Sequence, residues 1–437
     1  MRFRVRRPRR FVGTAEVPGD KSVSHRAALL GAIASGPTEV QGFLEADDCL
    51  GTIAAVQGLG AEVTRKGPGH YRIAGAGLHG LQEPADILDC GNSGTTARLL
   101  LGILAGQPFW AFLTGDDSLR RRPMGRVAEP LRLMGATVIG RADSARLPLG
   151  VRGSETLRAI AWETPVASAQ VKSAILLAGL YADGPVSVTE PAPSRDHSER
   201  MLARFGARIT REGRRVTLTP SAAGLRGTTV RVPGDISSAA FLLVAGAVVG
   251  DGRVTVRDVG VNPTRTGLLD VLAAMGARIG RSGASDEGEP TASLTVEAAA
   301  LQGTPVGGPL IPRLIDEVPA LAVAAVVANG VTTIADAAEL RVKESDRIAV
   351  LAGELGRLGA RVREAPDGLV LEGGRRLRGA RVASGGDHRM AMALTVAGLV
   401  ADGETVVEDT ACVGTSFPGF VETINALAGE AVVTVEP

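Results

Sequence analysis

The chain has 437 residues, a formal net charge of +1, 45% apolar residues and only 3% aromatic residues. The near-neutral charge argues against a surface that coats nucleic acid, so any basic site must be local. With so few aromatics, the core must be built from Ala, Val, Leu and Ile, which is typical of an α/β protein. The length predicts two or three domains or one large two-lobed unit.

Cysteine and histidine usage argues against disulfides and structural zinc. The cysteines are Cys49, Cys90 and Cys412, without CxxC spacing, and the five histidines form no HxxxH pair. We therefore expect reduced thiols, no metal and a cytoplasmic protein. The basic N-terminus, MRFRVRRPRR, lacks the apolar run of a secretory signal, and no segment has the apolar length to span a bilayer. We interpret it as an exposed strand or arm, with a nucleic-acid or targeting role as the less favoured alternative.

One phrase recurs six times along the chain: a polar opening, an apolar run, a turn glycine and a β-rich segment such as RVTVRDV or ETVVEDT. The turn glycines are Gly36, Gly106, Gly184, Gly252, Gly330 and Gly403. A second phrase, of the type LGAEV, ends a helix and begins a strand. Its glycine should adopt the left-handed conformation of a helix C-terminal cap. Copies lie at 59–63, 134–138, 205–209, 275–279 and 358–362, with a blurred sixth near the end.

The spacing of the turn glycines, 68 to 78 residues, predicts six small αβ subdomains rather than solenoid rungs. Six copies make two lobes of three. The phrase VPGD occurs at 17–20 and again at 232–235, where Pro-Gly marks the step from a strand into a helix. We interpret the two copies as the crossings between lobes. One lobe is then expected at 19–234, and the other should combine 1–18 with 235–437.

The four lysines are unevenly placed. Lys21, Lys172 and Lys343 stand in short polar motifs that open apolar runs, whereas Lys66 lies elsewhere; the other 44 of the 48 basic residues (48 − 4) are arginines. An ammonium is a compact charge and a guanidinium a wide fork, so the three positions indicate tight anion sites. Chance is the simpler alternative in so small a sample.

The polar openings should be helix N-termini, where backbone N–H groups and the helix dipole favour anions. CGNSGTTAR resembles a phosphate-cradling loop, although a capping turn explains it equally well. In RLIDEVPALAVAA, an acid before the helix is most often an N-cap. In RVKESDR, Glu344 and Arg347 could form an ordinary helix-surface pair. The chemistry-bearing residues of the openings are Lys21, Ser22, Arg26, Gly94, Arg98, Ser168, Gln170, Lys172, Asp316, Glu317, Asp387, His388 and Arg389.

If like repeats direct these openings toward a common cleft, the cations there would outnumber the acids Asp316 and Glu344. The cations would be Lys21, Arg26, Arg122, Lys172, Lys343, Arg347 and Arg389. Clustered positive charge is costly unless anions fill it. We therefore predict a cleft for two substrates that carry phosphate or carboxylate groups.

Seven motifs in order closely resemble the 5-enolpyruvylshikimate-3-phosphate (EPSP) synthase family and span nearly the whole chain. They are PGDKSVSHR, GNSGTTARLL, RRRPMG, ASAQVKSAILLAGL, LIDEVP, RVKESDR and DHRMAMA. The resemblance implies a two-lobed inside-out α/β barrel of six βαβαββ repeats, three per lobe, with the active site in the cleft between lobes.

The resemblance implies transfer of the enolpyruvyl group of phosphoenolpyruvate to the 5-hydroxyl of shikimate 3-phosphate, releasing phosphate, in chorismate and aromatic amino acid biosynthesis. It implies no cofactor. The charge and the lack of a long apolar run predict no nucleic-acid or membrane partner, and we expect a monomer. Asp316 would accept the hydroxyl proton, Glu344 would protonate the methylene carbon, and Lys21 would complete the catalytic set. Phosphoenolpyruvate would contact Lys21, Gly94, Arg122, Gln170, Arg347 and Arg389. Shikimate 3-phosphate would contact Lys21, Ser22, Arg26, Ser168, Ala169, Gln170, Arg195, Asp316 and Lys343.

Some positions depart from the family pattern. Thr415 stands where some members carry a lysine, and Glu339 replaces an asparagine, so neither contact is carried over. The strings GDKS, SAQVK, RDHSE and NPTR resemble the class II branch, which implies partial tolerance of glyphosate, although the small Gly94 leaves room for the inhibitor. Two alternatives remain: an enolpyruvyl transferase acting on UDP-N-acetylglucosamine, whose usual reactive-loop cysteine is missing from TGDDSLRRRPMG, and a catalytically silent anion-binding homologue.

Overall fold

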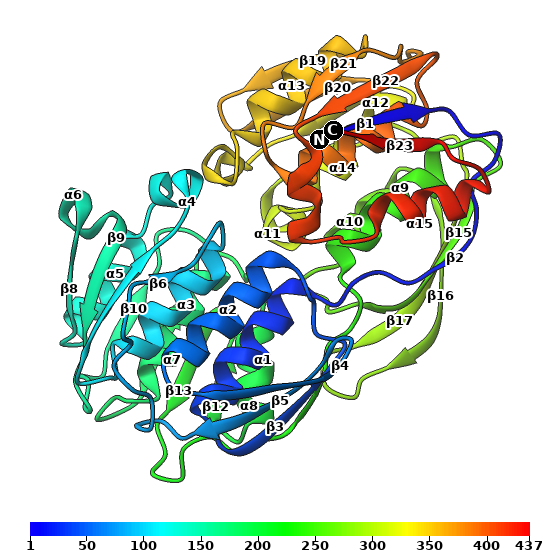
Figure 1. Cartoon of the computed structure of the whole chain (residues 1–437). Coiled ribbons are helices and arrows are strands. Elements are labelled where there is room, and N and C mark those ends of the chain that lie inside the picture. Colours follow the sequence, from blue (N-terminus) through cyan, green and yellow to red (C-terminus); the bar gives the residue numbers. More distant parts are fainter. The chain divides into compact units, whose positions relative to one another are not determined.

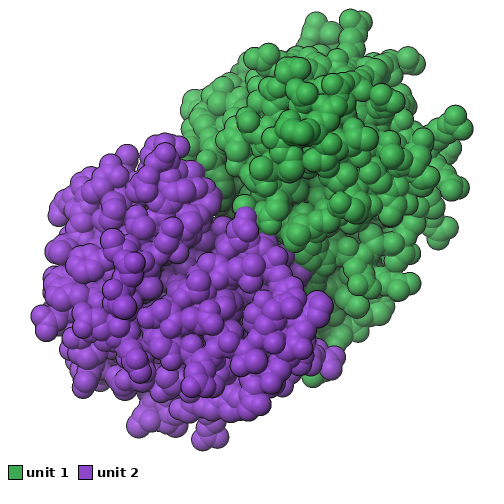
Figure 2. Space-filling view, viewed as in Figure 1, with its two compact units in different colours: residues 1–18, 233–437 green, residues 19–232 purple.

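The computed structural model describes residues 1–437 and divides the chain into two compact units. Unit 1 combines Met1–Pro18 with Pro233–Pro437, and unit 2 is Gly19–Val232 (Figure 2). The chain therefore passes between units twice, each time within a VPGD phrase. No helix combines the length and apolar character needed to cross a membrane.

Unit 2 contains three four-stranded sheets, in the orders β14-β3-β5-β4, β6-β7-β9-β8 and β10-β11-β13-β12. In each sheet the first pair is parallel and the other two pairs are antiparallel. The strands are β3 (Ser35–Gln41), β4 (Glu62–Gly67), β5 (His70–Ala76), β6 (Leu88–Asp89), β7 (Trp110–Thr114), β8 (Thr137–Gly140), β9 (Arg146–Arg152), β10 (Ala161–Glu163), β11 (Val186–Thr189), β12 (Arg208–Glu212), β13 (Arg215–Thr219) and β14 (Thr229–Arg231). The helices are α1 (Lys21–Ile33), α2 (Asp47–Gly58), α3 (Gly94–Leu104), α4 (Asp117–Arg121), α5 (Gly125–Leu133), α6 (Arg141–Ser144), α7 (Ala169–Gly179) and α8 (His197–Arg204).

Unit 1 also contains three sheets, in the orders β16-β17-β15-β2, β18-β20-β19 and β21-β22-β1-β23. The strands are β1 (Arg2–Arg6), β2 (Val12–Ala15), β15 (Arg253–Gly260), β16 (Arg278–Ser285), β17 (Thr291–Glu297), β18 (Val331–Ile334), β19 (Arg361–Ala365), β20 (Gly368–Glu372), β21 (Arg381–Ala383), β22 (Glu404–Glu408) and β23 (Val433–Glu436). The helices are α9 (Ile236–Val248), α10 (Gly267–Ala274), α11 (Ile311–Leu314), α12 (Val318–Val327), α13 (Arg347–Arg357), α14 (His388–Gly398) and α15 (Phe420–Ala428). The expected mixed α/β class is confirmed.

The apolar runs form helices that are buried on nearly every side. In α9 every residue from Ile236 to Ala247 is buried, and α12 and α14 are similarly enclosed. A helix that is apolar all round must lie inside a domain rather than on its surface. These three helices pack against one another, and each also packs against strands of unit 1 (Figure 1). In unit 2, α3 packs closely on α7.

The glycines of the second phrase end their helices as predicted. Their φ angles lie in the left-handed region, where a side chain would be strained, and a strand begins two residues later in each copy. The angles are 89° at Gly60, 106° at Gly135, 92° at Gly206, 94° at Gly276 and 88° at Gly359. In the blurred sixth copy Gly429 also has a left-handed φ, 71°, but β23 begins four residues later rather than two.

The basic N-terminus is a strand, but it is not exposed along a sheet edge. β1 lies between β22 and β23, and both pairings are antiparallel (Figure 1). Phe3 and Val5 point into the core, while the alternate arginines point outward. Arg4 pairs with Glu404 and Glu436, and these contacts lower the pKa of both carboxyls. The interpretation of this segment as an exposed strand is therefore corrected. The arginines of β1 lie on the outer face of the sheet, and glutamates of the neighbouring strands balance their charge.

Candidate active site

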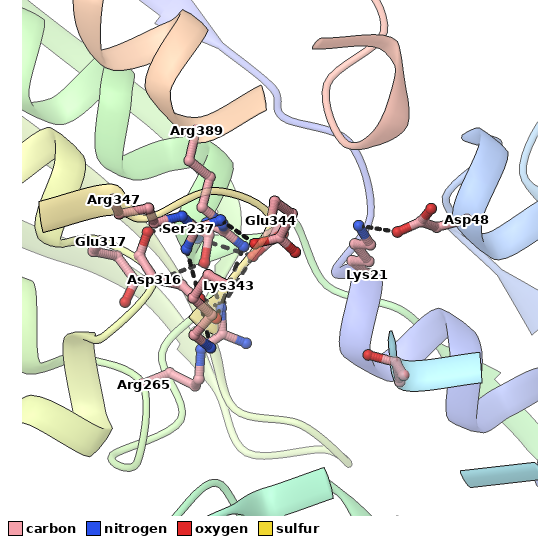
Figure 3. A network of polar contacts seen from close by, with 12 residues as sticks. Lys21, Asp48, Ser237, Arg265, Asp316, Glu317, Lys343, Glu344, Arg347 and Arg389 are labelled. Atoms are coloured by element: carbon pink, nitrogen blue, oxygen red, sulfur yellow. Dashed lines mark hydrogen bonds and ion pairs between the residues drawn. The ribbon is translucent and has the colours of Figure 1, made fainter. Parts of the chain in front are cut away.

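In unit 2, the N-terminus of α1 presents the first predicted site residues. Asp20 caps this helix, because its carboxylate accepts the Val23 N–H at 2.9 Å. Lys21 begins the helix, and its ammonium forms an ion pair with Asp48 in the first turn of α2 (Figure 3). Arg26 lies one turn further along and is buried. Its guanidinium donates to the carbonyl of Ser22, one turn earlier in the same helix, at 3.0 Å.

The N-termini of α3 and α7 are joined by side-chain hydrogen bonds. Arg98 donates to Gln170 Oε1 at 2.6 Å, and Gln170 Nε2 donates to Thr95 Oγ1 at 2.9 Å. Ser93 caps α3 by accepting the Thr96 N–H, so the loop is a capping turn, and its binding of phosphate stays a prediction. Gly94 follows the cap, and a Cβ built there would lie 2.6 Å from Arg98 Nη1.

Arg122 approaches the same loop from the RRRPMG motif. It is buried, and its Nη2 donates to Asn92 Oδ1 at 2.6 Å. A Cβ at Gly94 would lie 3.5 Å from its Nη1. The structure therefore brings together Gly94, Arg122 and Gln170, three residues predicted to contact the same substrate.

The remaining unit 2 candidates lie at the N-termini of α7 and α8. Ser168 is the N-cap position of α7, but its side chain makes no capping hydrogen bond, and Ala169 begins the helix. Arg195 lies in the segment before α8 and is half-buried. These residues lie at or just before helix N-termini, as we predicted for the polar motifs.

Lys172 does not lie among the cations that were predicted to bind an anion. Its side chain is only 2% exposed, and its ammonium lies 2.7 Å from Glu190 and 2.8 Å from Glu199. The expectation that Lys172 helps to bind an anion is therefore wrong, because two carboxylates already face its charge. Nothing near it in the sequence indicated these partners, which lie 18 and 27 residues further along.

In unit 1, the carboxylate of Asp316 faces three cationic side chains (Figure 3). Asp316 Oδ1 lies 3.2 Å from Arg347 Nη1 and 3.4 Å from Lys343 Nζ, and Oδ2 lies 4.0 Å from Arg389 Nη2. Arg389 also donates to the Asp316 carbonyl at 3.3 Å. Glu317 is the N-cap position of α12 and makes no side-chain cap. The interpretation of the acid as an N-cap is therefore wrong.

Arg347 links the two predicted catalytic acids. One of its Nη atoms contacts Asp316, and the other donates to Glu344 at 2.6 Å. The side chain is only 1% exposed and Glu344 precedes α13, so the ordinary helix-surface pair is also excluded. Burial by itself lowers the pKa of the guanidinium, but the carboxylates of Asp387, Glu344 and Asp316 outweigh it and raise the pKa overall. Arg347 is therefore cationic at every physiological pH.

Asp387 is the partner of Arg347 that the sequence analysis did not assign. It is fully buried, and it accepts from Arg347 Nε at 2.8 Å and from Ser345 Oγ at 3.1 Å. It also caps α14 through the Arg389 N–H. With Asp387 included, three acids face Lys343, Arg347 and Arg389, so the charges in this part of unit 1 are balanced. Only its position two residues before Arg389 could have suggested this role.

The two departures from the family pattern lie in short 3₁₀ helices of unit 1. Thr415 ends the helix Thr410–Thr415, where its hydroxyl donates to the Cys412 carbonyl at 2.7 Å. Glu339 lies in the helix Ala338–Val342, and this helix ends directly before Lys343. Neither side chain offers an ammonium or an amide, so we assign no substrate contact to Thr415 or Glu339.

Comparison with known proteins identifies the family. The model of the EPSP synthase (3-phosphoshikimate 1-carboxyvinyltransferase) family matches residues 5–424. The chain belongs to the EPSP synthase family. The resemblance predicted from the seven motifs is thereby confirmed.

Relatives of the EPSP synthase family match over nearly the whole chain. A 3-phosphoshikimate 1-carboxyvinyltransferase of Desulforudis audaxviator is 54% identical over 428 residues, covering 98% of this chain and 99% of the relative. One of Gloeobacter violaceus is 56% identical over 422 residues, covering 96% and 97%. A solved EPSP synthase structure from Acinetobacter baumannii is 43% identical, with a TM-score of 0.88 and full coverage of both chains.

Proposed function

We propose that this member of the EPSP synthase family transfers the enolpyruvyl group of phosphoenolpyruvate to the 5-hydroxyl of shikimate 3-phosphate and releases phosphate. Relatives that are 54% and 56% identical carry the name of this transferase activity. The structural observation that supports it best is the pairing of Asp316 and Glu344 on the single buried guanidinium of Arg347. Two carboxylates held this close together can transfer protons at neighbouring atoms of the two reacting substrates.

The proposed chemistry has an addition and an elimination. Asp316 accepts the proton of the attacking 5-hydroxyl as its oxygen bonds to C2 of phosphoenolpyruvate, and Glu344 delivers a proton to C3. In the elimination, Glu344 recovers a proton from C3, the double bond forms again, the C2–O bond to phosphate breaks, and Asp316 returns the hydroxyl proton to the departing phosphate. Lys21 serves as the third member of this catalytic set, beside the phosphate. Fixed cations around these acids stabilise the charge that develops, without reorganising at the moment of reaction.

Two groups of residues bind the substrates in this proposal. Cationic side chains and a glycine that leaves room for the ligand hold phosphoenolpyruvate: Lys21, Gly94, Arg122, Gln170, Arg347 and Arg389. Helix-start residues and cations hold shikimate 3-phosphate: Lys21, Ser22, Arg26, Ser168, Ala169, Gln170, Arg195, Asp316 and Lys343. Ala169 can contribute only its backbone. Support comes from the hydrogen bonds that tie Gln170 to Thr95 and Arg98, and Arg122 to Asn92, around the start of α3, where Gly94 lies.

We also propose the finer architecture implied by the family: six βαβαββ repeats in two lobes, 19–234 and 1–18 with 235–437, around one active site. Five of the six sheets share a pattern of one parallel and two antiparallel pairs, which supports this proposal; the sixth, β18-β20-β19, has the two antiparallel pairs alone. Because proposed site residues occur in both units, the reaction requires both. A monomeric, cytoplasmic enzyme remains part of the proposal, and its three cysteines, which form no disulfide, suit a reducing compartment.

Phosphate release tests the function. Purified protein receives phosphoenolpyruvate with either shikimate 3-phosphate or UDP-N-acetylglucosamine, beside Asp316→Ala and a control, Glu422→Ala, which changes an exposed acid of α15. We expect release with shikimate 3-phosphate alone, unchanged in the control and reduced about 10²- to 10⁴-fold in Asp316→Ala, as is usual when a general base is removed. Release with the sugar nucleotide alone would transfer the assignment to that acceptor, and no release with either would favour a silent binding protein.

A further inference from the structure

A buried cluster of charged residues lies in unit 2, outside the residues assigned to the reaction. We name it the Lys172 cluster; it consists of Lys172 in α7, Glu190 directly after β11 and Glu199 in α8. The ammonium lies 2.7 Å from Glu190 Oε2 and 2.8 Å from Glu199 Oε1. Buried ion pairs are weak net stabilisers, because desolvating the charges offsets their attraction. Their presence here therefore needs a reason other than stability.

Glu190 connects two substrate-binding segments. Its Oε1 accepts the backbone N–H of Ser168 at 3.1 Å, and its Oε2 accepts the backbone N–H of Ser194 at 3.3 Å. Ser168 begins the proposed binding segment of α7, and Ser194 directly precedes Arg195. One carboxylate therefore determines the position of both segments. The ammonium of Lys172 in turn holds that carboxylate in place.

Glu199 connects the same ammonium to α8. The residues next to Lys172 and Glu199 in sequence, Ser173 and Ser198, form hydrogen bonds with Arg26. Ser173 and Ser198 are within 2.6 Å of each other, and their hydroxyls accept from Arg26 Nη2 at 2.9 Å and from Nε at 2.7 Å. Glu199 lies in the first turn of α8, where the helix dipole favours its negative charge. The ion pair therefore clamps α7 to α8 beside the two hydroxyls that orient Arg26.

We propose that the Lys172 cluster positions the residues that bind shikimate 3-phosphate: Ser168, Arg195 and Arg26. This inference rests on the proposed function. The cluster touches no substrate; it holds the binding segments in one arrangement before the ligand arrives, which reduces the entropy that binding must overcome. Weakening it should therefore loosen shikimate 3-phosphate and leave the chemistry at Asp316 and Glu344 unchanged.

Glu190→Gln is the principal test. The amide keeps the shape of the side chain and one acceptor oxygen, but its NH₂ group must face either the Lys172 ammonium or one of the backbone N–H groups. We expect the KM for shikimate 3-phosphate, and its Kd measured by calorimetry without phosphoenolpyruvate, to rise about tenfold, which corresponds to one strong hydrogen bond to a charged group. The kcat and the KM for phosphoenolpyruvate should stay within about twofold.

Glu199→Gln is the second test and guards against misfolding. It leaves Lys172 and Glu190 as a neutral pair, so no unpaired charge remains buried, and we expect a smaller rise in the same KM and Kd, about threefold. Glu45→Gln is the matched control, since Glu45 pairs with Arg65 in the same unit and should change neither constant. Thermal unfolding of each variant establishes that it is folded.

The outcomes distinguish a failure of the proposed function from a failure of the positioning role. A wild-type protein that neither binds nor converts shikimate 3-phosphate overturns the proposed function and the inference with it. A wild type that binds it, beside folded Glu190→Gln and Glu199→Gln proteins with an unchanged Kd, overturns the inference alone. An equal loss of affinity for both substrates also overturns the inference, because a merely structural role of the cluster predicts that pattern. A selective loss for shikimate 3-phosphate supports the positioning role.

Discussion

Arg347 shows why particular positions in this chain require a guanidinium. Its planar fork has donors directed three ways, so one buried side chain reaches Asp387, Glu344 and Asp316 at once. A lysine ammonium is a single point and could not make the same three contacts. The reverse holds at Lys172, where one compact charge fits between two carboxylates. The uneven use of lysine is therefore explained at position 172 by buried acids rather than by an anionic ligand.

His25 should make the stability of the protein depend on pH. Burial, followed by the charges of Lys21 and Arg26, holds the pKa of the imidazole well below its usual range, and its Nδ1 lies 2.7 Å from Thr52 Oγ1. As the pH falls below about 6.5, the unfolded chain binds a proton there that the folded chain does not, so the free energy of unfolding falls. The slope should reach at most about 1.4 kcal/mol per pH unit for this one group.

Denaturant unfolding between pH 7 and pH 5 measures this slope. His25→Gln should flatten it, whereas His79→Gln, which changes an exposed histidine of the same unit, should not. Equal slopes in wild type and His25→Gln would show that His25 has the same pKa in the folded and the unfolded chain, and would contradict this prediction.

Gly94 should control the response to glyphosate. The wild type is expected to be partly tolerant, with an inhibition constant above its KM for phosphoenolpyruvate. In Gly94→Ala the new Cβ would lie 2.6 Å from Arg98 Nη1, so Arg98 must move and loosen its bond to Gln170. We expect the glyphosate inhibition constant to rise about tenfold, more than the KM for phosphoenolpyruvate.

Competition kinetics against phosphoenolpyruvate give both constants. Gly51→Ala, in open space on α2, should change neither of them. A wild-type glyphosate inhibition constant at or below the KM for phosphoenolpyruvate would contradict the expected tolerance. If both constants rise equally in Gly94→Ala, the substitution does not discriminate between glyphosate and phosphoenolpyruvate.

At the scale of elements, the site depends on helix N-termini that are capped by aspartate or serine. Asp20, Asp235 and Asp387 cap α1, α9 and α14, and Ser93 caps α3. Each cap satisfies one backbone N–H and determines where the helix starts. The side chains in the next turn, including Lys21 and Arg389, are thereby placed at the helix end. Both VPGD phrases use this device, since their aspartates are two of these caps.

Helix packing predicts opposite effects for two glycine substitutions. Gly102 lies where α3 meets α7, and a Cβ there would be 2.2 Å from the Ala174 carbonyl oxygen, so Gly102→Ala should lower the free energy of unfolding by about 1 to 3 kcal/mol. Gly353 lies on the exposed face of α13 with no atom within 4 Å of such a Cβ. Gly353→Ala should raise the free energy of unfolding by about 0.5 to 1 kcal/mol. Chemical denaturation measures both, and a stabilising Gly102→Ala would show that α3 and α7 can separate freely.

At the scale of the whole molecule, the two units differ in how the chain builds them. Unit 2 is one continuous segment, Gly19–Val232, whereas unit 1 needs both Met1–Pro18 and Pro233–Pro437. The short N-terminal piece is not peripheral. β1 is an inner strand that supplies Phe3 and Val5 to the core, and β2 pairs with β15. Unit 1 therefore cannot complete its sheets until distant parts of the chain have met.

Fragments should show this difference. A fragment of residues 19–232 should unfold cooperatively on heating, because its sheets and core are complete. A fragment of residues 233–437 should not, because β22 and β23 lose the strand that pairs with both of them, and the core loses Phe3, Val5 and Phe11. Circular dichroism during heating distinguishes the cases. Cooperative unfolding of the second fragment would mean that β1 is dispensable.

The sequence by itself determined the mixed α/β class, the helix-ending glycines such as Gly135 and the family, because these depend on local preferences and on motifs a few residues long. It also placed Asp316, Glu344 and Arg389 at helix starts. Only the tertiary structure decided that β1 lies inside a sheet, that Lys172 is buried between acids, and that Asp387 holds Arg347. The physical reason is that those arrangements depend on partners 18 to 400 or more residues away, whose charges and strand edges no local pattern encodes.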